Sequence, residues 1–135
     1  ALAMALLTFA VWLRLFFTRI PEMKRRRIHP QSIALSAQAA AAFQDTRAAD
    51  NFRNLFELPV LFYALVPLAL LTRKADLLFV VLAWAFVATR LVHAGVFVTS
   101  NHVPTRFRAY MAGVLVLFVL WAVFAVRILL APALP

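Results

Sequence analysis

The residues of this chain best able to do chemistry are polar and ionisable side chains set inside otherwise apolar stretches. Between positions 47 and 57 such side chains recur at helical spacing, which predicts a polar stripe along one face of a helix. The stripe consists of Arg47, Asp50, Asn51, Asn54 and Glu57, with Arg53 at its edge. Ionisable groups are costly inside a membrane, so we expect the stripe to face other helices or a polar ligand.

Two later apolar stretches, at 90–100 and 106–113, carry polar faces of the same kind. The first face holds Arg90, His93, Phe97 and Ser100, and the second holds Arg106, Tyr110 and the small Gly113. Counted from the short loop at 73–76, Glu57 and Arg90 fall at similar depth. We therefore predict a Glu57–Arg90 ion pair that fixes the register of two helices, as support and not as a catalyst.

Four polar residues are expected at one end of these helices, where they form a pocket: Arg53, Asn54, Arg106 and Tyr110. A guanidinium binds a carboxylate bidentately and an amide both donates and accepts, so the pocket suits a small ligand with carboxylates and peptide-like bonds. His93 lies among these groups either as an interhelical hydrogen-bonding residue or as a proton carrier. No other histidine stands at metal-ligand spacing from it, and no metal site is predicted.

Composition excludes a water-soluble fold. Hydrophobic residues make up 65% and charged residues 14% of the 135 residues, and the mean hydropathy is +0.90. The net charge of +9 does not indicate nucleic acid, because the arginines lie between or inside apolar stretches; membrane lipid headgroups or a small anion fit better. The chain has no cysteine, so any thiol chemistry needs an external thiol.

The hydropathy pattern predicts an all-α membrane protein, a four-helix transmembrane bundle within a single domain over residues 1–135. The expected spans are 1–17, 47–72, 77–100 and 105–131, with an interfacial connection at 28–45. Pro59 and Pro67 each free a carbonyl one turn earlier in the second span, which predicts added acceptors or a kink there. A bundle this small does not line a large polar cavity alone, so a site between chains is expected.

Basic residues concentrate in the first and third loops, which share one side of the membrane in this topology. The positive-inside rule then predicts that both termini lie outside and that the polar site faces the cytoplasm. The run from Lys24 to Arg27 is interpreted as an anchor to anionic lipids; because it follows its apolar segment, a membrane helix is favoured over a signal peptide. Arg14 and Arg127 are expected to reach the membrane surface from helix ends.

The polar segments resemble the MAPEG superfamily, the membrane-associated proteins in eicosanoid and glutathione metabolism. The run RAADNFRNLFE at 47–57, ending in R-N-x-x-E, is similar to the superfamily's signature at the start of a membrane helix. The later pattern of Arg90-x-x-His93 followed by Pro104-x-Arg106-x-x-x-Tyr110 is similar to the prostaglandin E synthase branch. Together these motifs cover roughly residues 47 to 113.

The resemblance implies a bacterial inner-membrane homotrimer that binds glutathione between neighbouring chains and reacts it with a lipophilic substrate from the membrane. Arg106 matches the arginine that stabilises the glutathione thiolate and is the implied catalytic residue. The implied glutathione-binding residues are Arg19, Arg53, Asn54, Glu57, His93 and Tyr110, and the match of Arg19 is the weakest because the loop after it differs in length.

Two positions depart from the pattern. Asp50 stands where related glutathione enzymes often have an arginine, and Phe97 stands where they have a tyrosine, so two ligand contacts are missing. Three functions therefore stay open: a glutathione transferase or peroxidase, a noncatalytic membrane subunit whose polar stripe holds its helices together, and a small-anion transporter. The transporter is least favoured because no inverted repeat is evident.

Overall fold

A computed structural model describes residues 1–130 of the chain, and within that range every regular element is a helix. The elements are α1 (Leu2–Arg26), the short 3-10 helix η1 (Pro30–Ile33), α2 (Ser36–Ala42), α3 (Arg47–Asn54), α4 (Leu58–Leu71), α5 (Leu77–Val98) and α6 (Val103–Leu129). Four segments of the described chain are long and apolar enough to cross a membrane: α1, α3 with α4, α5, and α6. The prediction of an all-α protein with four spans is confirmed, and the protein is integral to the membrane; the predicted end of the last span, Ala131, lies outside the described residues.

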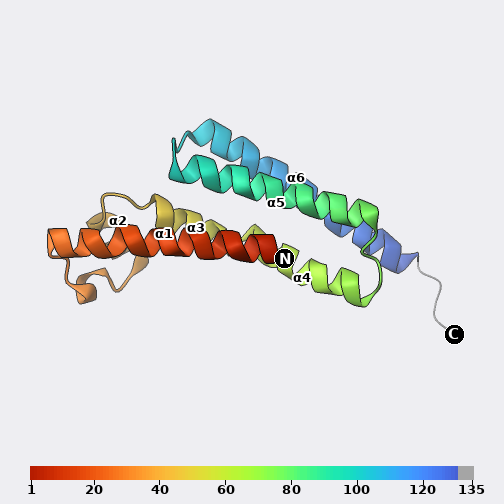
Figure 1. Cartoon of the computed structure of the whole chain (residues 1–135), viewed down its shortest axis with the longest axis horizontal. Coiled ribbons are helices and arrows are strands. Elements are labelled where there is room, and N and C mark those ends of the chain that lie inside the picture. The colour runs from red at the N-terminus through yellow and green to blue at the C-terminus, as the bar shows by residue number, and fades with distance from the viewer. Residues whose placement is uncertain (131–135) are drawn as a thin grey trace.

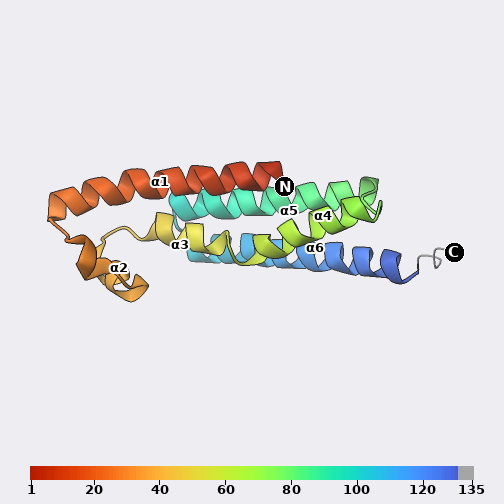
Figure 2. The same cartoon turned by 90° about the horizontal axis from the view of Figure 1, so that it is seen from below.

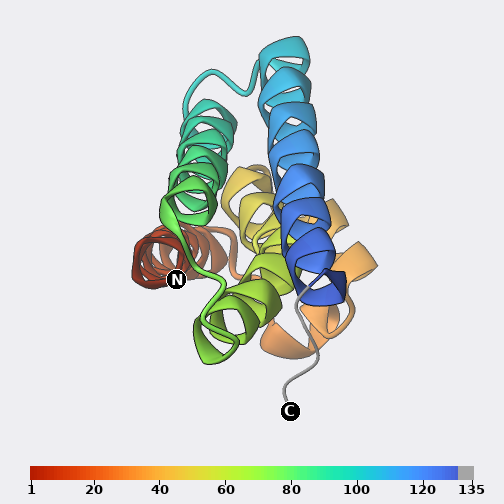
Figure 3. The same ribbon diagram turned by 90° about the vertical axis from the view of Figure 1, so that its right-hand side faces the viewer.

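The helices form two layers. α5 and α6 run side by side as an antiparallel pair, and α1 with the α3–α4 segment lies beneath them (Figure 1). Viewed from the end, α1 and α4 lie below the α5–α6 pair, with α3 behind α4 (Figure 3). This arrangement brings one end of α3, α5 and α6 together at the α5–α6 loop.

The second span is broken, where a single helix over 47–72 was predicted. α3 ends at Asn54 and α4 begins at Leu58, with Glu57 in a non-helical conformation (φ −93°, ψ −98°) between them. A continuous helix would need an N–H at Pro59 to bond the Leu55 carbonyl, and proline has none; in the first turn of a new helix that N–H is not needed. Added acceptors or a kink were predicted at both Pro59 and Pro67; the chain breaks just before Pro59, whereas α4 continues through Pro67.

α1 is offset along its own axis from the other helices. Its Arg14 donates from Nη2 to the carbonyl of Val98, the last residue of α5, at 3.1 Å. The rest of α1, from Leu15 to Arg26, extends roughly 18 Å further and projects past the ends of α5 and α6 (Figure 2). Arg14 thus joins α1 to the end of α5, a contact that the sequence did not predict, and its reach to the membrane surface stays a prediction.

The connection after α1 consists of η1 and α2, folds back against α1 and does not cross the membrane. Two contacts hold this return: Glu22 accepts from the Gln44 backbone N–H at 2.7 Å, and Arg26 donates to the Ala42 carbonyl at 2.5 Å. Figure 2 shows η1 and α2 beside the projecting end of α1.

The α4–α5 loop is held by an ion pair that the sequence did not predict. Asp76 caps α5 by accepting from the Phe79 N–H at 3.0 Å, and both its oxygens accept from Arg127 of α6 at 2.6 Å. The Phe79 N–H and the Arg127 guanidinium hold the pKa of Asp76 below its usual value. The structure gives Arg127 a carboxylate partner at this end of the bundle, and its reach to the membrane surface stays a prediction.

The core is apolar toward the α4–α5 loop and polar toward the opposite end. Phe62 of α4 stacks on Phe86 of α5 with centroids 4.9 Å apart, and both side chains are buried. Leu117, Leu120 and Phe124 of α6 complete this part of the core. The buried polar side chains of the described chain are Asn51, Arg90 and His93, and they belong to the other half. The fold thus separates an apolar packing region from a polar region.

Candidate functional site

A pocket of about 190 Å³ lies where α3, α5 and α6 meet near the α5–α6 loop. Its lining consists of Asn54 from α3, His93 from α5, and Val103, Arg106, Phe107 and Tyr110 from α6. Four of these residues are among those that the sequence predicted. In the described part of the chain this lining includes a guanidinium and no carboxylate, so the pocket favours an anionic group.

Arg106 is held in place by two neighbours. Its Nη1 donates to Asn101 Oδ1 at 2.6 Å, and its guanidinium carbon lies 4.1 Å from the centroid of the Phe97 ring. Asn101 adopts a left-handed conformation (φ 49°) in the α5–α6 loop, which asparagine tolerates better than most residues. The cation is thus presented in a defined position at the first turns of α6.

Asn101 was missed as a site residue. The signal that could have found it is a turn-forming asparagine five positions before the arginine. Phe97 was placed on the face of Arg90 and His93 and noted as the loss of a tyrosine hydroxyl, but its contact with Arg106 was not predicted.

His93 and Tyr110 face one another across the α5–α6 pair. Their ring centroids lie 5.9 Å apart, and His93 also packs edge-on against Phe97 at 5.7 Å. His93 is buried and Tyr110 is partly exposed, so the phenol is the more accessible of the two rings. His93 and Tyr110 line the pocket together with Arg106, so a ligand in the pocket would contact both rings.

The predicted Glu57–Arg90 ion pair is wrong for this chain. Within residues 1–130 no carboxylate lies within ion-pair distance of Arg90; its Nη2 instead donates to the Ala109 and Tyr110 carbonyls of α6 at 3.2 Å each. Glu57 is exposed at the break between α3 and α4. The prediction assumed a continuous helix, and the break at Pro59 removes the helical register on which it depended.

The same break, together with local pairing, divides the predicted polar stripe. Arg47 turns back to Asp45 (2.7 Å) and donates to the Thr99 carbonyl (3.2 Å), and this arginine lowers the pKa of Asp45. Asn51 is fully buried, and neither polar atom of its amide has a hydrogen-bond partner within residues 1–130. Only Asn54 from the stripe lines the pocket with Arg106.

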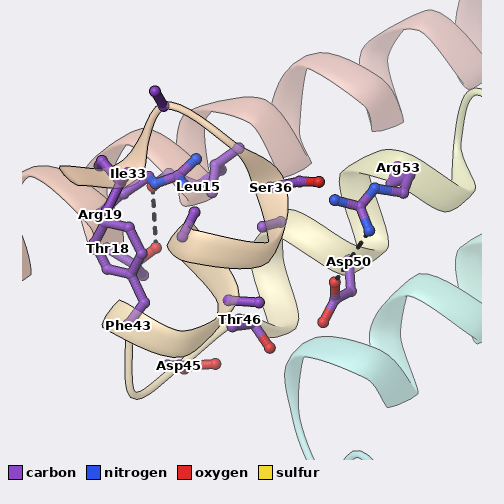
Figure 4. Close-up of a pocket in the computed structure, with 14 residues that line it drawn as sticks. Leu15, Thr18, Arg19, Ile33, Ser36, Phe43, Asp45, Thr46, Asp50 and Arg53 are labelled. Carbon is purple, nitrogen blue, oxygen red and sulfur yellow. Dashed lines mark hydrogen bonds and ion pairs between the residues drawn. The ribbon is translucent and has the colours of Figure 1, made fainter. Parts of the chain in front are cut away.

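Arg19 and Arg53 lie in a different pocket of the same chain. This second pocket, of about 270 Å³, is enclosed by α1, the η1–α2 return and α3 (Figure 4). The Arg19 guanidinium carbon lies 4.6 Å from the centroid of the Phe43 ring, and Arg53 lies 4.0 Å from Asp50. Within one chain, then, the structure does not bring these two arginines to Arg106.

Acids and bases are mixed in the second pocket, in contrast to the first. Asp45 and Asp50 line it together with the two arginines. Asp50, which departs from the family pattern, faces Arg53 as an exposed pair, and a pair of this kind contributes little to stability. Among residues 1–130, no group of three or more histidine, aspartate or glutamate side chains could hold a metal ion.

Fold and site together define a class: an all-helical integral membrane protein with a cationic pocket at one end of its helices. The model of the MAPEG family matches residues 1–126, and the chain therefore belongs to the MAPEG family. Searches of curated proteins and of solved structures give no match to this chain. Membership indicates a membrane function related to glutathione or eicosanoids.

Proposed function

We propose that this protein is a glutathione-dependent membrane transferase or peroxidase that acts on a lipophilic electrophile. The observation that carries the proposal is the convergence of Asn54, His93, Arg106 and Tyr110 on one pocket without a carboxylate. Family membership supports glutathione as the thiol, and the spacing from Arg90 to Tyr110 supports kinship with the prostaglandin E synthase branch.

The residues of the pocket fit glutathione by their chemistry. Arg106 supplies a cation for the sulfur, while the Asn54 amide and the Tyr110 phenol supply hydrogen bonds for peptide and carboxylate groups. Bound glutathione supplies the nucleophilic sulfur, and only its thiolate reacts readily because a free thiol has a pKa of about 8.5. Arg106, fixed by Asn101 and Phe97, stabilises that anion without reorganising, which raises the reactive fraction at neutral pH.

The pocket of one chain is too small for a tripeptide, which supports a site completed by a neighbour. Its volume of about 190 Å³ is below the roughly 300 Å³ at which ligand pockets begin. We propose a homotrimer in which Arg19 of one chain reaches the pocket of the next. Arg53 and Glu57, exposed beside Asn54 on the same segment, would extend the binding surface toward that neighbour.

The proposed location is the bacterial inner membrane, with both termini outside and the pocket at the cytoplasmic face. The basic loops at both connections on the pocket side support this orientation. A lipophilic substrate would enter from the bilayer, while glutathione would enter from the water. Binding both reactants in one site makes their reaction effectively unimolecular, which lowers the entropic part of the barrier.

Calorimetric titration of the detergent-purified protein with glutathione and with S-methylglutathione tests the thiol site. We expect glutathione to bind more tightly than its S-methyl derivative, and we expect Arg106→Ala to abolish that preference and to lower turnover about a hundredfold. The matched control is Arg108→Ala, an exposed arginine on the same helix that does not line the pocket. Turnover that survives in Arg106→Ala would disprove the role of this residue.

Mixing two inactive variants tests the shared site. Chains carrying Arg19→Ala and chains carrying Arg106→Ala are co-expressed, and mixed trimers are isolated by two affinity tags. If Arg19 acts on the neighbouring pocket, some mixed trimers contain an intact site and regain activity. Mixed trimers as inactive as the parents would mean that both arginines serve the same chain.

A noncatalytic subunit is the second candidate, favoured by the contacts that already occupy Arg106. In that case Arg106 and Asn54 only hold helices together, and Asp50 and Phe97 mark a site that has lost its ligand. Arg106→Ala would then lower the melting temperature, and glutathione would neither give heat nor raise the melting temperature of the unaltered protein.

A further inference from the structure

Arg90 is the largest fully buried side chain of the described structure, with 1% of its surface exposed, and it has no carboxylate partner there. Its Nη2 donates to two successive carbonyls of α6, those of Ala109 and Tyr110, at 3.2 Å each. Its guanidinium carbon lies 5.2 Å from the centroid of the Tyr110 ring and 5.6 Å from that of Phe86. A buried cation is tolerated only when groups such as these carbonyls and rings compensate it.

Gly113 supplies the space through which Arg90 reaches α6. A Cβ added at Gly113 would collide with Arg90 Nη2 and would also lie 2.9 Å from the Thr89 hydroxyl. A screw displacement of α6 by one residue, which combines a rise of about 1.5 Å with a rotation of about 100°, would bring Ala112 or Val114 to this point. Either side chain would displace the guanidinium, so Arg90 can keep its present bonds to α6 only when Gly113 lies at this point.

We propose that Arg90 and Gly113 form a positioning lock that sets the register of α6, and with it the place of Arg106 and Tyr110 opposite His93. The proposal rests on the function proposed above, since it assigns the lock to the thiolate site. Arg106 precedes Tyr110 by four residues and so lies on the same face of α6, one turn closer to the α5–α6 loop. Arg90 touches no ligand and is therefore a positioning residue.

The two glycines of the chain provide a matched pair of variants. Gly113→Ala places a methyl group against Arg90, whereas at Gly95 on α5 an added Cβ meets no atom of residues 1–130 within 4 Å. The readout is the fraction of bound glutathione present as thiolate, followed by ultraviolet absorbance across a pH series. S-methylglutathione, which has no thiol, reports binding alone.

We expect Gly113→Ala to lower the thiolate fraction at neutral pH about tenfold and to change S-methylglutathione affinity by less than about threefold. Gly95→Ala should leave both quantities unchanged. Arg90→Lys, which keeps a cation that can reach a carbonyl, should retain more thiolate than Arg90→Met. An unchanged thiolate profile in Gly113→Ala would overturn the proposal, and so would a parallel loss of both ligands, because general loosening of the bundle does not single out the sulfur.

A double-mutant cycle tests the lock without any ligand. Melting temperatures are measured for Gly113→Ala, Arg90→Met and the double variant. If the methyl group acts by displacing Arg90, the fall in melting temperature caused by Gly113→Ala should be at least halved in the Arg90→Met background. The fall that remains would come from the contact between the methyl group and Thr89. If the two falls in melting temperature simply add in the double variant, the positioning lock is disproved. If the falls do not add but the unaltered protein binds no thiol, the lock is supported and the proposed function is disproved.

Discussion

The α5–α6 pair and α1 are both rich in apolar residues, but they differ in how many of those residues pack within the chain. In the most apolar part of α5, 33% of the residues are buried within the chain, against 11% for α1. α5 contacts α6 through Arg90, His93 and Phe97 as well as through apolar side chains, and Gly113 allows the close approach. α1 instead exposes large side chains such as Leu6, Phe9 and Phe17 along its length.

This difference in burial follows from the surrounding lipid, which solvates apolar side chains. Lipid is as apolar as leucine, so helices in a membrane gain little from hiding apolar surface from it, and close packing and interhelical hydrogen bonds hold them together. The α5–α6 pair has both, and of the four predicted site residues that line the Arg106 pocket it carries three, His93, Arg106 and Tyr110. α1 has neither along most of its exposed face, which is left to lipid or to another chain.

The largest effect that would test this contrast is a matched phenylalanine truncation. Phe86→Ala on α5 removes a fully buried ring stacked on Phe62, and we expect it to lower the free energy of unfolding by about 3 kcal/mol. Phe9→Ala on α1 removes a ring that is 65% exposed, and it should change stability by less than about 0.5 kcal/mol. Denaturation in detergent measures both; equal losses would break the contrast and indicate that another chain covers Phe9.

A smaller effect is expected where a buried polar group lacks partners. Asn51 on α3 is fully buried with an amide that bonds nothing within residues 1–130, whereas Arg90 lacks a partner there for Nε but bonds two carbonyls through Nη2. Replacing it with the similarly sized leucine should raise the free energy of unfolding by about 1 kcal/mol. Thermal melting measures the change, and a clear loss of stability would show that the amide is satisfied in the assembled protein.

The smallest effect is expected at the Asp76–Arg127 ion pair, which ties α5 to the end of α6. The pKa of Asp76 lies below its ordinary value of 3.8, so the carboxylate is charged and the pair stabilises the fold at neutral pH; this contribution is lost as pH falls through the lowered pKa. Asp76→Asn keeps an oxygen for the Phe79 N–H and removes the charge. It should lower the melting temperature by a few degrees at pH 7 and less at pH 3; an equal loss at both values would assign the effect to the cap.

Much of this architecture could be predicted from the sequence because the bilayer imposes simple rules. Length and hydropathy located the four spans, Pro59 and Pro67 indicated added acceptors or a kink in the second, and the ionisable residues indicated a polar end. A pocket of Arg53, Asn54, Arg106 and Tyr110, with His93 among them, was predicted from residue types and helical spacing, and the structure brings all of these except Arg53 to one pocket. Their chemical role stays a prediction.

The errors share a cause. The Glu57–Arg90 pair and the continuous stripe were inferred by extending an ideal helix through Pro59, and the break removes that register. The sequence also did not predict the partners of Arg14 and Arg127, which are the Val98 carbonyl at the end of α5 and the Asp76 carboxylate before its start. Spacing along a chain does not reveal which side chain of another helix lies nearby.

The sequence by itself determined that this chain is a helical membrane protein of four spans with basic residues gathered at one end, because span length and residue polarity are local properties. Only the tertiary structure decided which polar groups meet. Arg19 of α1 and Arg53 of α3 share a pocket separate from that of Arg106. Arg90 donates to carbonyls of α6 and has no carboxylate partner within residues 1–130. These outcomes depend on the offset of α1, the break at Pro59 and the contact between Arg90 and Gly113, which arise only when helices pack.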